Sequence, residues 1–271
     1  MDRTRWFPES RKRIDRAIVH VKAFDAEWKR VFNPKAYEFV TEPNSEWTAG
    51  FTRAVRKTPI ENSLALELGE FFYQLRAALD SLIYQTAVYV EKDPPTDMER
   101  LYFPICARQK TFNDSPIHSA PFPIEITNWL KTLQPYMASQ TTDSDTLEII
   151  RLLTLINQCA KVDRHRHLHI MAVFPTHLKC EFAKDPPTLK VVNLRGVRVN
   201  FLESDDPFLF FGIEGADLSR RNYIKLKTDL RMEIAIGQIP IATGDTLNTE
   251  INKMIAAVDY VVRWFESGFS L

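Results

Sequence analysis

The feature that most constrains the fold is an apolar segment over residues 64–89. Its apolar side chains recur at the three- and four-residue spacing of an α-helix: Leu64, Leu68, Phe71, Phe72, Leu75, Leu79, Leu82, Ile83 and Val88. They cover more than half of the helical circumference, so other elements have to bury such a helix. Charged residues interrupt the segment and count against a membrane span: Glu67, Glu70, Arg76 and Asp80. The sequence therefore predicts a central, largely buried helix.

The remaining segments predict a mixed fold. The helical period also runs through residues 9–32, 123–133, 146–170 and 246–266. Alternating residues predict a β-hairpin over 36–57, and short runs between Pro, Gly and Asp predict an antiparallel sheet over 177–236, which the hairpin could extend. We expect an α+β fold, with a helical bundle core, a sheet in the C-terminal half and a final helix that packs back. The predicted domains are residues 1–172, helical with the inserted hairpin, and residues 173–271, together forming one compact unit.

Composition excludes several classes of function. The chain has 35 Lys+Arg and 35 Asp+Glu, which argues against attachment to nucleic acid by bulk charge. It has 8 glycines and neither the dinucleotide-binding nor the P-loop motif. Three widely spaced cysteines, Cys106, Cys159 and Cys180, fit free buried thiols better than disulfides or a zinc site. The polar N-terminus has no secretory signal, so we expect a cytoplasmic protein without a membrane partner.

An ionisable pair interrupts the central helix. Arg76 and Asp80 stand four residues apart, so they lie on the same helical face. Burying a charge is costly unless it is paired, so the pair must face a partner, a cleft or water. It is either an ion pair at the edge of the helix or a holder of groups on the helix at 146–170.

A second cluster, NQCAKVDRHRHLH, ends the helix predicted at 146–170. Cations there complement the helix dipole, which is a structural explanation for the whole cluster. Three chemistries are also open. His165 and His169 could share a metal ion; a histidine and an arginine could cleave RNA by general acid–base catalysis; or the same groups could bind an anion without turnover.

Four segments together resemble a set of uncharacterised bacterial proteins: LGEFFYQLRAALDSLIYQ, YFPI, LQPY and NQCAKVDRHRHL. These proteins have an R-x-x-x-D helix followed by a helix with Asn-x5-Asp-Lys-His-Arg. The matching positions here are Arg76, Asp80, Asn157, Asp163, His165 and Arg166. Arg164 replaces the usual Lys, which keeps the charge and changes its shape. The resemblance covers about residues 64–170 and carries no established activity.

The helical half also resembles HEPN domains, which are helical bundles and often ribonucleases of toxin and antiphage systems. Arg164-x4-His169 fits their Arg-x4–6-His motif, whereas the hairpin and the β-rich tail depart from the family. The resemblance implies a metal-independent endoribonuclease without cofactor, with RNA as partner and a site formed across a homodimer. The implied catalytic residues are Arg164, His165, Arg166 and His169. The implied supporting residues are Arg76, Asp80, Asn157 and Asp163.

The alternative hypothesis is a non-catalytic binding or interaction protein. Its Arg/Asp/His cluster would be a buried polar network that fixes how two helices pack. The two hypotheses differ in stability. Asp80→Ala or Arg166→Ala should strongly lower the Tm of a structural network, whereas a catalytic site tolerates such changes.

Overall fold

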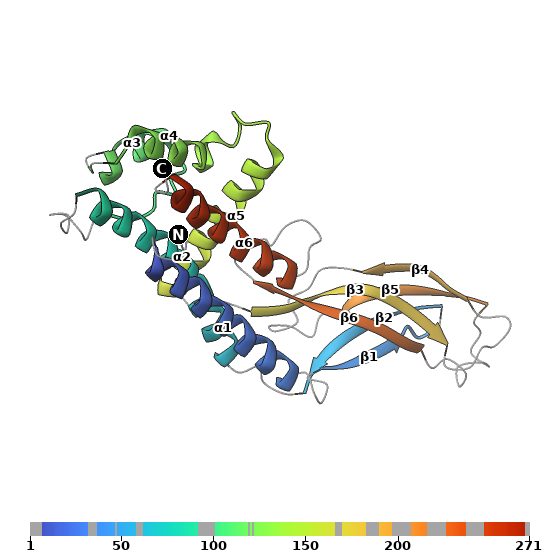
Figure 1. Ribbon diagram of the computed structural model, residues 1–271. Helices are drawn as coiled ribbons and strands as arrows, with labels where there is room; N and C mark the ends of the chain where they lie inside the picture. Colours follow the sequence, from blue (N-terminus) through green and yellow to red (C-terminus); the bar gives the residue numbers. More distant parts are fainter. Residues whose placement is uncertain are drawn as a thin grey trace. The chain divides into compact units, whose positions relative to one another are not determined.

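The computed structural model describes residues 7–31, 37–46, 48–57, 62–91, 101–118, 120, 122–165, 170–182, 190–196, 207–215, 226–236 and 247–268. Six α-helices lie within these ranges: α1 (Pro8–Val31), α2 (Asn62–Glu91), α3 (Gln109–Asn113), α4 (Ile124–Thr132), α5 (Ser144–His165) and α6 (Leu247–Gly268) (Figure 1). Two 3₁₀ turns accompany them, η3 (Pro116–His118) and η4 (Pro135–Met137). The strands are antiparallel, so the α+β prediction is confirmed.

The chain divides into two compact units, and neither is continuous in sequence. The helical unit contains residues 1–25, 65–168 and 248–271, and the sheet unit contains residues 26–64 and 169–247. This division differs from the predicted domain boundaries in two places. The hairpin predicted at 36–57 belongs with the strands, and the last helix belongs with the other helices.

Helix α2 forms the core of the helical unit. Its fully buried side chains are Leu68, Phe71, Phe72, Leu75, Ala78, Leu79, Leu82 and Ile83. Helix α1 is bonded to it at several points: His20 Nδ1 lies 2.8 Å from Glu67 Oε2, and Arg13 donates to Gln74 Oε1 at 3.1 Å. The predicted bounds, 64–89, fall within two residues of the observed helix at each end. Apolar periodicity was thus sufficient to locate it.

Helix α6 packs on the other helices of its unit, as predicted. Its buried face carries Ile251, Met254, Val258, Val261, Val262 and Phe265. Charged side chains reinforce the contact. Arg11 of α1 pairs with Glu266 and Asp259, and Arg151 of α5 donates to both carboxylate oxygens of Glu250 at 3.0 and 2.9 Å. The Glu250 carboxylate has no exposed surface, and Arg151 at 2.9 Å and Lys253 at 3.9 Å supply the positive charge that its burial requires.

The strands form two separate sheets. The first has four strands in the order β1-β2-β5-β4: β1 (Tyr37–Pro43), β2 (Ala49–Arg56), β5 (Pro207–Glu214) and β4 (Lys190–Gly196). The second is a pair, β3 (Ile170–Phe182) with β6 (Leu226–Ile236). The hairpin therefore extends the C-terminal strands, because β2 pairs with β5.

Two details of the β prediction need correction. The single sheet expected over 177–236 is split, since β5 pairs with the distant hairpin on one side and with β4 on the other. Strand β3 begins at Ile170, whereas the sequence predicts that the preceding helix reaches that residue; the described part of α5 ends at His165. Alternation locates strands, but it does not identify their partners.

Candidate functional site

The Arg76–Asp80 pair is hydrogen-bonded to the main chain of Phe103, a partner that the sequence does not predict. Arg76 is buried, and its Nη2 donates to Asp80 Oδ1 at 2.8 Å and to the carbonyl oxygen of Phe103 at 2.7 Å. Asp80 Oδ1 in turn accepts the Phe103 amide at 2.9 Å. One ion pair therefore satisfies both main-chain polar groups of a buried residue. Hydrogen bonds to ionised groups are the stronger kind, so the pair anchors the chain at Phe103.

Gln134 holds the same segment at two further residues, Pro104 and Cys106. Its side chain is fully buried; Oε1 accepts the Cys106 amide at 2.9 Å, and Nε2 donates to the carbonyl oxygens of Pro104 and Leu130 at 3.0 and 2.8 Å. Residues 101–106 have no regular secondary structure, so these side chains supply the main-chain hydrogen bonds that a neighbouring strand would supply in a sheet. The YFPI and LQPY motifs are thus partners in one hydrogen-bonded arrangement, which we call the 101–106 clamp. It comprises Arg76, Asp80, Gln134 and the segment they hold.

The basic end of α5 reaches the same segment. Burial raises the pKa of the Cys106 thiol, while the positive charges of Lys161 and Arg76 act in the opposite direction. Lys161 therefore lies close enough to Cys106 to act on its ionisation. Arg76 and Asp80 of α2 thus act on residues 101–106 through hydrogen bonds, and Lys161 of α5 acts on them through its charge.

Some of the predicted site residues lie within the described ranges, and others lie outside them. Asn157 is half-buried on α5, and Asp163, Arg164 and His165 follow in the last described turn of that helix. Arg166 and His169 lie outside the described residues. Of the predicted set, the structure thus places the side chains of Arg76 and Asp80 together. The Arg164-x4-His169 motif stays a prediction.

Thiol and metal chemistry find little support in the described residues. Burial raises the pKa of both Cys106 and Cys159, which disfavours the reactive thiolate form. No group of three or more His, Cys, Asp or Glu side chains within the described ranges could hold a metal ion. Of the two histidines in the metal hypothesis, His165 and His169, the second lies outside those ranges.

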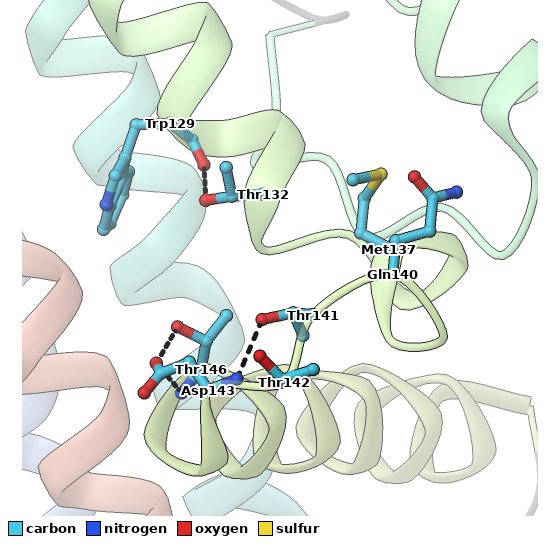
Figure 2. Close-up of a pocket in the computed structure, with 8 residues that line it drawn as sticks. All are labelled: Trp129, Thr132, Met137, Gln140, Thr141, Thr142, Asp143 and Thr146. Atoms are coloured by element: carbon cyan, nitrogen blue, oxygen red, sulfur yellow. Dashed lines mark hydrogen bonds between the residues drawn. The ribbon is translucent and has the colours of Figure 1, made fainter.

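A pocket lies elsewhere in the helical unit, between α4, η4 and the start of α5 (Figure 2). Its volume is about 550 Å³, and its lining residues are Trp129, Thr132, Met137, Gln140, Thr141, Thr142, Asp143 and Thr146. None of the predicted site residues is among them. The polar composition of residues 136–145 predicts a loop and gives no sign of a pocket. The available signal was a tryptophan close to a stretch rich in threonine, glutamine and aspartate.

Comparison with known protein families, with curated proteins and with solved structures finds no match to this chain. The resemblance to HEPN domains therefore stays a prediction. Among the helices of the described ranges, none combines the length and the apolar character that crossing a membrane requires.

Proposed function

We propose that this chain is a binding or interaction protein in which the Arg76–Asp80 pair is structural. The observation that carries the proposal is the pair's use of its hydrogen bonds on both main-chain groups of Phe103. A catalytic pair has to offer its polar atoms to a substrate, whereas Arg76 Nη2 and Asp80 Oδ1 hold the protein's own chain. Removing Asp80 would take the carboxylate from the buried Arg76 and the acceptor from the Phe103 amide, and removing Arg76 would take the donor from the Phe103 carbonyl.

Two further observations support the proposal. Gln134 continues the same role at Pro104 and Cys106, so the clamp is a set of side-chain contacts to main chain and not an isolated pair. Cys106, a thiol of the clamped segment itself, is held away from its reactive form by burial. Both observations concern residues of the helical unit, and both favour an architectural use of the ionisable groups there.

A ribonuclease assay tests the proposal directly. Purified wild-type protein is incubated with single-stranded and hairpin RNA in the presence of EDTA, with His165→Ala and His169→Ala variants in parallel. We expect the three proteins to leave RNA equally intact. Cleavage by the wild type that either substitution abolishes would contradict the proposal and favour catalysis.

That result would favour the second candidate, a HEPN-like metal-independent ribonuclease of the bacterial cytoplasm, acting as a toxin or an antiphage effector. One observation favours it: the charge of Lys161 acts at the 101–106 clamp, and Arg164 and His165 follow one turn later on α5. Arg164 and His169 would form the motif pair, with His165 as proton carrier and Arg166 as anion-binding group. RNA would be the substrate, and a homodimer would complete the site.

A further inference from the structure

The pocket between α4 and α5 has three distinct walls (Figure 2). Trp129 of α4 stands at one side, and Met137 and Gln140 stand opposite it. Asp143 and Thr146, at the start of α5, form a third side. A volume of about 550 Å³ falls within the roughly 300–1,000 Å³ that small-molecule sites occupy.

The aromatic wall of the pocket is held in place from behind. Trp129 is stacked on Trp264 of α6, with ring centroids 3.8 Å apart and an angle of 5° between the rings. The Phe265 ring meets the Trp129 indole nearly at right angles, with centroids 5.7 Å apart. These contacts fix the orientation of the indole, whose negative face attracts positively polarised C–H groups. A rigid aromatic wall of this kind suits the C–H face of a sugar ring.

The polar walls offer both donors and acceptors. Gln140 has an amide oxygen and an amide nitrogen, and Thr141 and Thr142 have hydroxyl groups that can donate or accept. Asp143 is an acceptor: hydrogen bonds from the Thr146 hydroxyl and amide, at 2.5 and 2.9 Å, lower its pKa and keep it ionised near neutral pH. Sugar hydroxyls need such a mixture, because each donates and accepts.

The charge of the pocket argues against anionic ligands. Among the described residues that line it, Asp143 alone is charged, and it carries a negative charge at the N-terminus of α5. The positive end of the helix dipole is therefore already paired with a carboxylate. Phosphate groups, nucleotides and RNA would meet repulsion here and no lysine or arginine. A neutral, hydroxyl-rich ligand fits the lining best.

We propose that the pocket between α4, η4 and the start of α5 binds a neutral carbohydrate, with one sugar ring against Trp129 and its hydroxyl groups on Gln140, Asp143 and Thr142. This inference rests on the pocket alone. It holds whether the 101–106 clamp is structural or catalytic, and its failure leaves the proposed function untouched.

Saturation-transfer NMR with a panel of neutral sugars tests the inference. The probes are glucose, galactose, mannose, N-acetylglucosamine, maltose and cellobiose, with inorganic phosphate as the anionic comparison. We expect saturable binding of at least one sugar and none of phosphate. Gln140→Ala should weaken the sugar's affinity by about three- to tenfold, as for the loss of one or two hydrogen bonds. Gln158→Ala, an exposed glutamine of α5 outside the pocket, should bind like the wild type.

Two variants guard against loss of folding. Trp129→Phe keeps an aromatic ring against Trp264, so it should weaken sugar binding and leave the circular dichroism spectrum unchanged. Thr142→Ala alters an exposed residue only, so the protein should stay folded. The inference is overturned if no sugar of the panel binds saturably up to ~100 mM, the weakest affinity that counts as specific here. It is equally overturned if the sugar binds Gln140→Ala and Trp129→Phe as tightly as it binds the wild type.

Discussion

At the residue scale, the helical unit depends on side chains that bind main chain. Residues 101–106 have no regular secondary structure, and Gln134, Arg76 and Asp80 supply hydrogen bonds to Phe103, Pro104 and Cys106. The energetic asymmetry of buried hydrogen bonds makes these side chains more important than their individual bonds suggest. Forming such a bond stabilises modestly, but removing one partner leaves the other desolvated and unsatisfied.

Gln134→Ala tests this asymmetry. The substitution leaves the Cys106 amide and the Pro104 carbonyl without their side-chain partner, so we expect the free energy of unfolding to fall by about 2–4 kcal/mol. Urea unfolding measures the change, and amide hydrogen exchange at Cys106 should accelerate. Gln158→Ala is the matched control and should change stability by less than about 0.5 kcal/mol. Equal stability of the two variants would mean that Gln134 is not an anchor.

For individual helices and strands, the sequence predicted those positions that hydrophobic periodicity determines. Helix α2 was located within two residues at each end, and the hairpin predicted at 36–57 appears as β1 and β2. Pairing is a different matter, because β2 meets β5 across some 150 residues of chain and no local pattern records this. The clamp was missed for a similar reason. Arg76 and Asp80 stood out as an anomaly, but their partner is main chain, which has no sequence signature.

The contact between α5 and α6 depends on one buried carboxylate. Arg151→Ala removes from the fully buried Glu250 the nitrogen that donates to both of its carboxylate oxygens, and leaves it the more distant Lys253 at 3.9 Å. We expect a loss of about 3 kcal/mol in the free energy of unfolding, the lower end of the effect of breaking a buried ion pair, because Lys253 still offsets part of the charge. Arg16→Ala, at an exposed position of α1, is the control. If Arg151→Ala unfolds at the same denaturant concentration as Arg16→Ala, the ion pair does not hold α6.

The start of α5 gives a pH dependence of defined sign. Hydrogen bonds from Thr146 lower the pKa of Asp143 from its ordinary value of 3.8. A lowered folded-state pKa stabilises the protein above the unfolded-state pKa, and this contribution disappears as the pH falls through the folded-state value. Asp143→Asn should therefore lower the Tm near neutral pH, and the difference from wild type should shrink below about pH 4. A difference that stays constant down to pH 2.5 would contradict this.

At the scale of the whole molecule, two units are each built from separated stretches of chain. The sequence predicts domains that are each one continuous stretch of chain, whereas in the structure the hairpin joins the strands and α6 joins the helices. Both reassignments join parts that a continuous domain would keep separate: β2 pairs with the edge of β5, and α6, which has a buried apolar face, forms ion pairs with α1 and α5. The apolar faces were visible in the sequence, but which surface covers each of them was not.

The structural interpretation of the helical unit depends most on Arg76 and Asp80, which hold the chain at Phe103. Equilibrium unfolding of Asp80→Ala, with Asp15→Ala at an exposed position of α1 as its control, tests this claim most directly. We predict that Asp80→Ala lowers the free energy of unfolding by about 2–4 kcal/mol, because it removes the carboxylate beside the buried Arg76 and the acceptor of the Phe103 amide. Stability equal to or above that of the wild type would contradict the account, because substitutions in a catalytic site, not in a structural clamp, have that effect.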